Sequence, residues 1–503
     1  MESRASSAWS GCGRLIRILL LCLACWTPAV RADDIGATAR SVVRVVTIAT
    51  VEGQVIGFGH GSGVAVAPNR IVTNAHVVEL AARYPDDVLI GVVPSEGARS
   101  WRGRLIAYDA ERDLALIEFG GARLPPAALF TGPMTDGEGL VALGYPGNVD
   151  LATARSAADY ISPVAPVRSE GVFSGRRRLA GTEVLLHTAA IARGNSGGPL
   201  LDRCGRVVGV NSAITRNEAG DTSFGFAIAA SEVMAFLREA GQRAPTSGLP
   251  CTSMEERLRA DAQADAESAA EAAAARRDAA TAASLKREQA LIAAGEAAAR
   301  TRENVMGLAG LLLVLGALAV GGAGFLHLLG RREEQWWALA GGVAGMAAGV
   351  LVFVNRPGAV PPPPELAEAA PAAAPVPAGR LACAFDPGRS RVIVSTAENA
   401  SLDWKGKGCT AEGGWAEVEG RWQRIALGEG GVVSVRRYDP LARRLDDTRW
   451  LLSAGDAARV RRLAAPDACG ADPAKLAEAQ AAIRAALPGL PNEKLSYRCT
   501  PAR

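Results

Sequence analysis

The stretch Gly-Asn-Ser-Gly-Gly-Pro-Leu at residues 194–200 restricts the fold of this chain more than any other feature. Glycine adopts backbone conformations that other residues avoid, so the chain can turn sharply around Ser196. Such a turn exposes the serine hydroxyl and aims backbone N–H groups at a bound carbonyl oxygen, as a nucleophilic serine requires. Taken by itself, the stretch also fits a Gly-rich surface turn with a solvated serine.

A histidine and an aspartate lie upstream of this serine in apolar, strand-like surroundings. His76 lies in Thr-Asn-Ala-His-Val-Val, and Asp113 opens the run Asp-Leu-Ala-Leu-Ile. Hydrolysis by a serine triad needs a general base and a carboxylate that orients it. The chain has four histidines, and His76 is the one whose neighbouring residues, downstream acids and downstream serine stretch all fit a triad. Asp109 is the rival candidate for the acid.

Residues from about 40 to 240 resemble a chymotrypsin-fold serine endopeptidase of the bacterial HtrA/DegP type. Besides the three stretches above, the resemblance rests on Gly-Ser-Gly-Val at 61–64, Gly-Tyr-Pro-Gly at 144–147, Gly-Val-Phe-Ser at 171–174, 205–211 and 225–228. It implies that residues 33–245 form a trypsin-like protease domain, an all-β double barrel. Two departures are Ala192, where the family usually has Asn, and the lack of a recognisable PDZ-like segment after the protease region.

The resemblance also assigns roles to individual residues. Ser196 would be the nucleophile, His76 the general acid/base and Asp113 the orienting acid. The backbone N–H groups of Gly194 and Ser196 would form the oxyanion hole. The specificity pocket would be formed by Ala190, Asn211, Ser212 and Ala213.

Ala190 lies six residues before the nucleophile, where trypsin-like enzymes that cut after Lys or Arg carry an acid. A buried cation would find no counter-charge there, whereas an apolar side chain gains free energy from burial. We therefore expect cleavage after small or medium apolar residues. An alternative is that His187, just upstream, favours glutamate at the cleaved bond.

The first 32 residues have the pattern of a secretory signal peptide. An arginine-bearing start precedes an apolar core at residues 18–26, and Val-Arg-Ala at 30–32 resembles a cleavage site. Export agrees with the cysteines, because an even number, six, follows the leader. Cys204 and Cys251 are the two in the N-terminal part and are expected to pair. None of the six has Cys-x-x-Cys spacing, so a zinc site is not expected. No other metal or cofactor is expected either.

The chain after the protease region divides by composition. Residues 252–304 are Ala-rich and charged, which predicts a helical stalk with weak coiled-coil character. Two apolar runs, 305–329 and 336–354, predict a two-helix transmembrane hairpin. The Pro/Ala-rich segment 355–379 predicts an extended linker. Residues 380–503 are expected to form a small α+β domain with two disulfides, strands at 391–395 and 431–435, and a helix at 474–487.

Orientation follows from two signals. The leader exports the residues after it, and Arg331 and Arg332 between the apolar runs favour the cytoplasm. We expect a protein of the inner (cytoplasmic) membrane whose protease and C-terminal domains face the periplasm. The net charge of +3 gives no sign of nucleic-acid binding.

The leading hypothesis is a membrane-anchored serine endopeptidase that cleaves exported proteins through an acyl-enzyme, with a role in envelope protein quality control. Its partners would be protein or peptide substrates, the membrane and other copies of the chain in a homo-oligomer. One alternative is a latent or inactive protease-like domain used for binding or sensing at the membrane. Another is a structural envelope protein in which the protease fold only docks partners.

Overall fold

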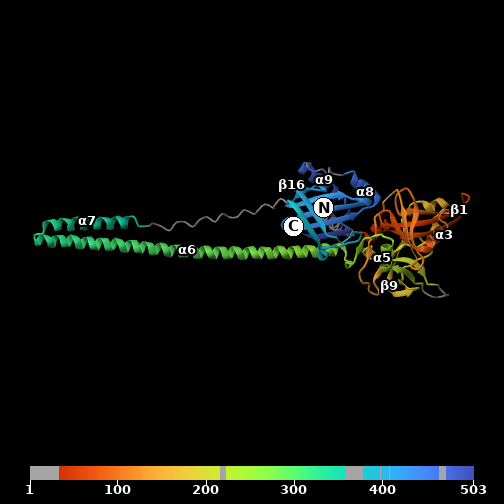
Figure 1. Ribbon diagram of the computed structural model, residues 1–503, viewed down its shortest axis with the longest axis horizontal. Coiled ribbons are helices and arrows are strands. Elements are labelled where there is room, and N and C mark those ends of the chain that lie inside the picture. The colour runs from red at the N-terminus through yellow and green to blue at the C-terminus, as the bar shows by residue number, and fades with distance from the viewer. Residues whose placement is uncertain are drawn as a thin grey trace, which may run out of the picture. The chain divides into compact units, whose positions relative to one another are not determined.

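The computed structural model describes residues 33–121, 123–215, 223–356, 378–396, 398–406, 408–463, 469 and 472–502. The predicted signal peptide and nearly all of the predicted linker lie outside this part of the chain. Contacts divide the chain into two compact units, one up to Asp261 and again from Ala373, and one spanning Ala262–Ala372. Figure 1 shows the elements of both.

The first half of the protease region is a closed barrel of six antiparallel strands, in the order β1-β2-β3-β6-β5-β4. Alternating β-branched residues build its core, because they suit a pleated surface that is buried on one face. The strands are β1 (Val42–Val51), β2 (Gln54–Ala67), β3 (Arg70–Thr73), β4 (Val88–Pro94), β5 (Trp101–Asp109) and β6 (Leu114–Phe119). Three short helices accompany them: α2 (Asp34–Ala39), η1 (Ala75–Val77) and α3 (Glu79–Arg83).

The second half is an eight-stranded sheet in the order β11-β8-β9-β10-β13-β12-β7-β14. A further pairing of β11 with β12 closes six of these strands into a ring, so the region has two barrels. The strands are β7 (Leu129–Phe130), β8 (Gly139–Gly144), β9 (Val167–Leu179), β10 (Thr182–His187), β11 (Pro199–Asp202), β12 (Val207–Ile214), β13 (Gly225–Ala229) and β14 (Thr246–Ser247). The helices are α4 (Gly147–Thr153), η2 (Ala157–Ile161) and α5 (Ala230–Glu239).

The predicted stalk and the first predicted span form one uninterrupted helix, α6 (Met254–Leu328), which is followed by α7 (Arg332–Val354). Both helices are long and apolar enough to cross a membrane. Figure 1 shows α7 running back beside the far end of α6. The two helices approach closely at glycines: a β-carbon on Gly342 would lie 2.7 Å from the Gly316 carbonyl oxygen. Such contacts are typical of helix pairs in membranes.

The C-terminal region is a nine-stranded antiparallel sheet in the order β18-β17-β16-β15-β23-β22-β21-β20-β19. Its strands are β15 (Gly379–Phe385), β16 (Ala400–Gly406), β17 (Cys409–Thr410), β18 (Gly413–Gly414), β19 (Ala416–Val418), β20 (Arg421–Leu427), β21 (Val432–Asp439), β22 (Arg444–Leu451) and β23 (Glu493–Pro501). Its helices are η3 (Pro387–Arg389), η4 (Glu429–Gly431), α8 (Ala454–Arg461) and α9 (Pro473–Ala486). The helix expected at 474–487 corresponds to α9 within one residue, and the strand expected at 431–435 corresponds to β21, which continues to Asp439.

The strand expected at 391–395 is absent from the described chain, and one buried carboxylate explains why. Glu493 accepts hydrogen bonds from the backbone N–H groups of Ile393, Val394 and Ser395. Those donors would otherwise join a ladder with a neighbouring strand. Only an isolated bridge remains, between Arg391 and Lys494.

The described residues contain two disulfides. Cys204–Cys251 is the predicted pair, and it joins the end of β11 to the chain just before α6. Cys383–Cys499 links the adjacent strands β15 and β23, which hold these residues directly opposite each other. Two disulfides were expected in the C-terminal region, and its described residues contain this one. Sheet register decides which cysteines face each other, and the sequence does not specify that register.

We predict that the double variant Cys204→Ser/Cys251→Ser lowers the free energy of unfolding. The disulfide spans 47 residues, and closing such a loop in the unfolded chain is worth about 4 kcal/mol, with measured losses of about 2–5 kcal/mol. Thermal unfolding of the detergent-solubilised full chain measures the loss, and Cys409→Ser is the matched control because Cys409 is outside both disulfides. Two free thiols at 204 and 251 in non-reducing peptide maps would refute the pairing.

Candidate active site

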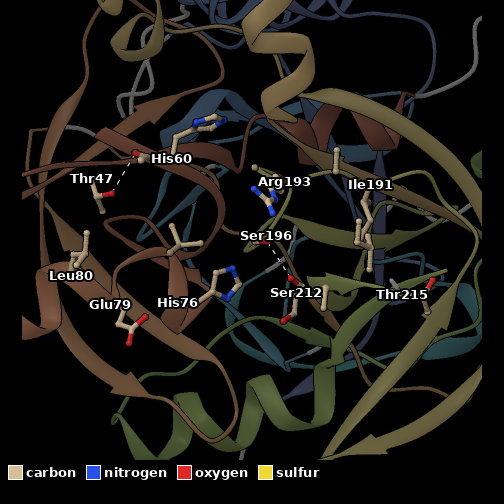
Figure 2. A pocket seen from close by; sticks show the side chains of 16 residues that line it. Thr47, His60, His76, Glu79, Leu80, Ile191, Arg193, Ser196, Ser212 and Thr215 are labelled. Carbon is tan, nitrogen blue, oxygen red and sulfur yellow. Dashed lines mark hydrogen bonds between the residues drawn. The ribbon is translucent and has the colours of Figure 1, made fainter. Parts of the chain in front are cut away.

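A cleft of about 760 Å³ contains His76 and Ser196 (Figure 2). One wall comes from the first barrel, through β1, β2, η1 and α3. The other comes from the loop before β11 and from the end of β12. The lining residues are Thr47, Gly59, His60, His76, Val77, Glu79, Leu80, Ile191, Ala192, Arg193, Gly194, Ser196, Ser212, Ala213, Ile214 and Thr215.

The structure brings His76 and Asp113 into direct contact. Nδ1 of His76 lies 2.9 and 3.0 Å from the two carboxylate oxygens of Asp113, and the backbone N–H of His76 donates to the same carboxylate at 3.0 Å. The contact with Asp113 raises the pKa of His76 above its ordinary value, although desolvation partly opposes it. A ring nitrogen fixed in this way as a donor leaves Nε2 free to accept a proton.

Asp113 has an uncommon backbone conformation, with φ of 54°. Few residues other than glycine adopt positive φ, and those that do are concentrated at functional sites. Here the side chain of Asn74 donates to the Asp113 carbonyl at 2.9 Å and so helps to hold the turn. This turn at the start of β6 aims the carboxylate at η1, which carries His76.

Ser212 connects the acid to the serine. Its hydroxyl donates to Asp113 Oδ2 at 2.6 Å. Its carbonyl accepts the Ser196 hydroxyl at 3.1 Å, as Figure 2 shows. Among the hydrogen bonds of the described residues, the Ser196 hydroxyl thus donates to Ser212 and not to His76. A catalytic hydrogen bond is often long or absent before substrate binds, because it tightens only in the reacting complex.

Two glycines fix the path of the serine loop. Gly194 and Gly197 have φ of 99° and 85°, which suits glycine and strains other residues. A β-carbon on Gly197 would lie 2.1 Å from the Ser62 carbonyl oxygen, and one on Gly194 would lie 2.2 Å from that of Tyr145. Both positions therefore need glycine for conformation and for space.

The peptide units of this loop have a defined orientation. The Arg193 carbonyl accepts from Gly147 N–H at 2.7 Å, and the Asn195 carbonyl accepts from Gly198 N–H at 2.9 Å. The C=O and N–H of a trans peptide point in opposite directions. The N–H groups of Gly194 and Ser196 consequently point away from the Gly147 and Gly198 N–H groups, and neither donates to an acceptor among the described residues.

Ser62 holds this loop against the first barrel, and sequence reasoning did not give it a role. Its hydroxyl donates to the Gly194 carbonyl at 2.7 Å and accepts from Tyr145 N–H at 3.0 Å, while its own N–H donates to the Ser196 carbonyl at 2.8 Å. The available signal was its place between two glycines in Gly-Ser-Gly-Val, which marks a close approach of the backbone.

The expected specificity residues divide into two groups. Ser212 and Ala213 line the cleft, but Ala190 and Asn211 do not. Asn211 is fully buried, and its side chain donates to the Pro199 carbonyl at 3.2 Å. His187 is also fully buried and lies outside the cleft lining, and this burial lowers its pKa to about 4.

Asp109 is not among the residues that line the cleft, and it has other hydrogen-bond partners. One of its oxygens accepts from the backbone N–H groups of Glu111 and Arg112, and the other accepts from the Arg112 guanidinium at 2.9 Å. It caps the turn between β5 and β6. The described residues contain no cluster of three or more His, Cys, Asp or Glu side chains suited to a metal ion.

The fold and this arrangement of histidine, carboxylate and serine define a trypsin-like peptidase domain. Residues 61–210 match the family described as the trypsin-like peptidase domain. The region is homologous to serine proteases of the HtrA/DegP type.

Three relatives illustrate the homology. Serine protease Rv3671c of Mycobacterium tuberculosis is 29% identical over 219 residues, which cover 44% of this chain and 51% of the relative. The putative serine protease HhoA of Synechocystis is 34% identical over 174 residues, covering 34% and 40%. Serine protease Do-like HtrB of Bacillus subtilis is 28% identical over 228 residues, covering 40% and 45%. The chain thus spans about half the length of these relatives or less.

Among solved structures, the active form of Rv3671c protease aligns with 25% identity and a TM-score of 0.34. The alignment covers 44% of this chain and 89% of that one.

We predict that Asp113→Asn reduces kcat by up to about 10⁴-fold, because an amide no longer fixes the tautomer of the histidine or stabilises its cation. Asp109→Asn is the matched control and should cost far less, since Asp109 contacts Arg112 and not His76. The pH dependence adds a second readout. His76 acts as a base only when neutral, so kcat/KM of the wild type should rise with pH through a midpoint above the ordinary histidine value of about 6.5.

In Asp113→Asn that midpoint should move to lower pH, because the carboxylate that favours the imidazolium is gone. Steady-state kinetics between pH 5 and 9 on a fluorogenic peptide measures both effects. Equal losses in the two variants, or a larger loss in Asp109→Asn, would show that the wrong carboxylate has been assigned.

Proposed function

We propose that this protein is a serine endopeptidase that hydrolyses peptide bonds through an acyl-enzyme. The observation that carries the proposal is the contact of His76 Nδ1 with both carboxylate oxygens of Asp113 in the cleft that also holds Ser196. The homology to HtrA/DegP-type serine proteases supports the same activity.

The geometry supports the following reaction. Ser196 Oγ attacks the carbonyl carbon of the substrate while His76 Nε2 takes the hydroxyl proton. The N–H groups of Gly194 and Ser196 stabilise the oxyanion, because they are unoccupied donors held in place before substrate arrives. His76 then protonates the leaving amine, and a water molecule activated by the same histidine releases the acid product.

The proposed substrates are exported or unfolded protein segments with a small or medium apolar residue before the cleaved bond. Ile191, Ala213 and Ile214 provide apolar surface at the cleft. Among the described residues, Glu79 is the one acidic side chain that lines the cleft, so a lysine or arginine would find little compensation there.

One observation favours the alternative of a latent protease domain used for binding or sensing. The Ser196 hydroxyl donates to the Ser212 carbonyl, so attack on a substrate requires it to rotate toward His76. A partner or substrate that induces this rotation would switch the enzyme on.

We predict that Ser196→Ala abolishes cleavage of casein by the purified full chain. Loss of the nucleophile removes nearly all catalysis, since the triad members act as a unit. Matched thermal unfolding curves of the variant and the wild type show that the fold is retained. Undiminished cleavage by Ser196→Ala would refute the enzyme assignment, and an intact but inert wild type would favour the latent form.

We further propose that α6 and α7 anchor the protein in the inner membrane, with the protease and C-terminal regions in the periplasm and other copies of the chain as partners. The two apolar helices and the Arg331-Arg332 turn between them support this topology.

This topology predicts that protease added to spheroplasts digests both the protease region and the C-terminal region. The turn at 329–332 should remain protected until the membrane is opened. Antibodies to tags placed in each part would follow the digestion by immunoblot, and a cytoplasmic protein serves as the control for intact membranes. Protection of either region in intact spheroplasts would overturn the two-span topology.

A further inference from the structure

A second histidine lies behind the serine loop, outside the triad. His60 is carried by β2, two residues before Ser62, and it lines the cleft. Its Nε2 is 3.3 Å from the Tyr145 carbonyl oxygen and 3.2 Å from Asp150 Oδ2. Asp150 is carried by α4, the helix that begins at Gly147 immediately after the Tyr145 turn.

The His60 ring contacts the segment that orients the Gly194 N–H, one of the two proposed oxyanion donors. A β-carbon on Gly194 would lie 2.9 Å from His60 Nε2, so the ring packs directly on this glycine. Gly147, which donates to the Arg193 carbonyl, lies next to the ring as well: a β-carbon there would lie 3.4 Å from His60 Cε1. His60 therefore lies beside Gly147, which donates this hydrogen bond, and beside Gly194, whose N–H belongs to the peptide unit that accepts it.

The surroundings define the protonation state of the ring. Both neighbours of Nε2 are oxygen acceptors, so Nε2 carries the hydrogen. The Nε2–H donates to the Tyr145 carbonyl. Asp150 Oδ2 forms no hydrogen bond with it and interacts with the ring only through its charge. Burial lowers the pKa of His60, and Arg44 adds to this effect while Asp150 and Tyr145 oppose it.

The charged and aromatic groups around the ring hold one another in place. On β1, the Arg44 guanidinium pairs with Asp150 Oδ1 at 2.7 Å and donates to the carbonyls of Asp159 and Tyr160. It also lies over the Tyr145 ring, 4.7 Å from the centroid. The Tyr160 ring packs 5.6 Å from that of His60. Arg44 thus balances the Asp150 charge, and His60 is left as a neutral donor.

We propose that His60 is a positioning residue for the oxyanion hole. Its Nε2–H fixes the Tyr145 carbonyl, and its ring supports Gly147 and Gly194, so that the Arg193–Gly194 peptide keeps its N–H directed at the substrate. This role rests on the proposed endopeptidase function. It predicts a defect in turnover more than in substrate binding, because the oxyanion forms in the transition state.

Paired substitutions test the role in the full-length protein. His60→Gln keeps an amide donor near the position of Nε2, whereas His60→Asn is too short to reach Tyr145. His60→Leu keeps similar bulk without any donor. Thr153→Ala, on the same helix as Asp150, is the control for general disturbance, since its hydroxyl bonds only within α4, to the Val149 carbonyl.

The measurements are kcat and KM on a fluorogenic peptide, the rate of Ser196 labelling by a fluorophosphonate, and thermal unfolding. We expect His60→Leu and His60→Asn to lower kcat by about tenfold or more, less than the roughly 10²–10³-fold cost of losing an oxyanion donor outright. KM should change by less than about threefold, His60→Gln should regain most of the wild-type kcat, and Thr153→Ala should match the wild type.

Equal kcat values for His60→Gln and His60→Asn would overturn the positioning role, and so would an unimpaired His60→Leu variant. If the leucine variant fails to fold, the Gln and Asn pair decides. A wild-type protein that neither cleaves peptide nor labels at Ser196 would instead refute the proposed function on which the role rests.

Discussion

The site depends on one buried hydroxyl, that of Ser62. It joins the first barrel to the serine loop and to the turn after β8, because it donates to Gly194 and accepts from Tyr145. The Ser62 backbone adds a bond to Ser196, and its carbonyl accepts from the Thr73 hydroxyl near η1. Ser62 thus links the loop that carries the proposed nucleophile, from the second barrel, to the first barrel, which carries the proposed base. A buried polar group of this kind is costly unless all its bonds are made, and here they are.

Charge is distributed around the cleft in a way that suits the proposed chemistry. The Asp113 carboxylate faces His76 and receives the Ser212 hydroxyl, so an imidazolium formed during catalysis meets a fixed counter-charge. On the far side of the serine loop, Arg44 and Asp150 pair with each other in a nearly buried position. This leaves neutral donors, the N–H groups of Gly194 and Ser196, to meet the oxyanion. Preorganised neutral donors need no rearrangement when charge develops.

The sequence anticipated features that depend on local pattern. The order His76, Asp113, Ser196 and the glycines around the serine reflect what a triad needs, and the structure brings the first two into contact. Asp113 and Asp109 are four residues apart, and only the turn with positive φ decides which carboxylate meets the histidine. The Cys204–Cys251 pair could be predicted by elimination, since no other cysteine lies between the predicted signal peptide and the predicted stalk.

Features that depend on strand register or on contacts between distant segments could not be predicted from the sequence. Asn211 precedes Ser212 and Ala213 by one or two residues, yet it is buried, and an irregularity in strand register between Asn211 and Ala213 leaves the next two residues at the cleft. The segment 391–395 has the composition of a strand, but the Glu493 carboxylate from a distant part of the chain captures its N–H groups. His60 and Asp150 are 90 positions apart, and no local pattern relates them.

The proposed activity requires that Ser196 is an activated nucleophile in a preformed oxyanion hole. Reaction of the full-length protein with a fluorophosphonate, followed by mass spectrometry of the modified peptide, tests it most directly. A serine activated by His76 should be labelled at Ser196 and at no other serine, and Ser196→Ala and His76→Ala should both abolish the labelling. Unmodified Ser196 in the folded wild-type protein, or equal labelling after loss of His76, would refute the proposed role of Ser196.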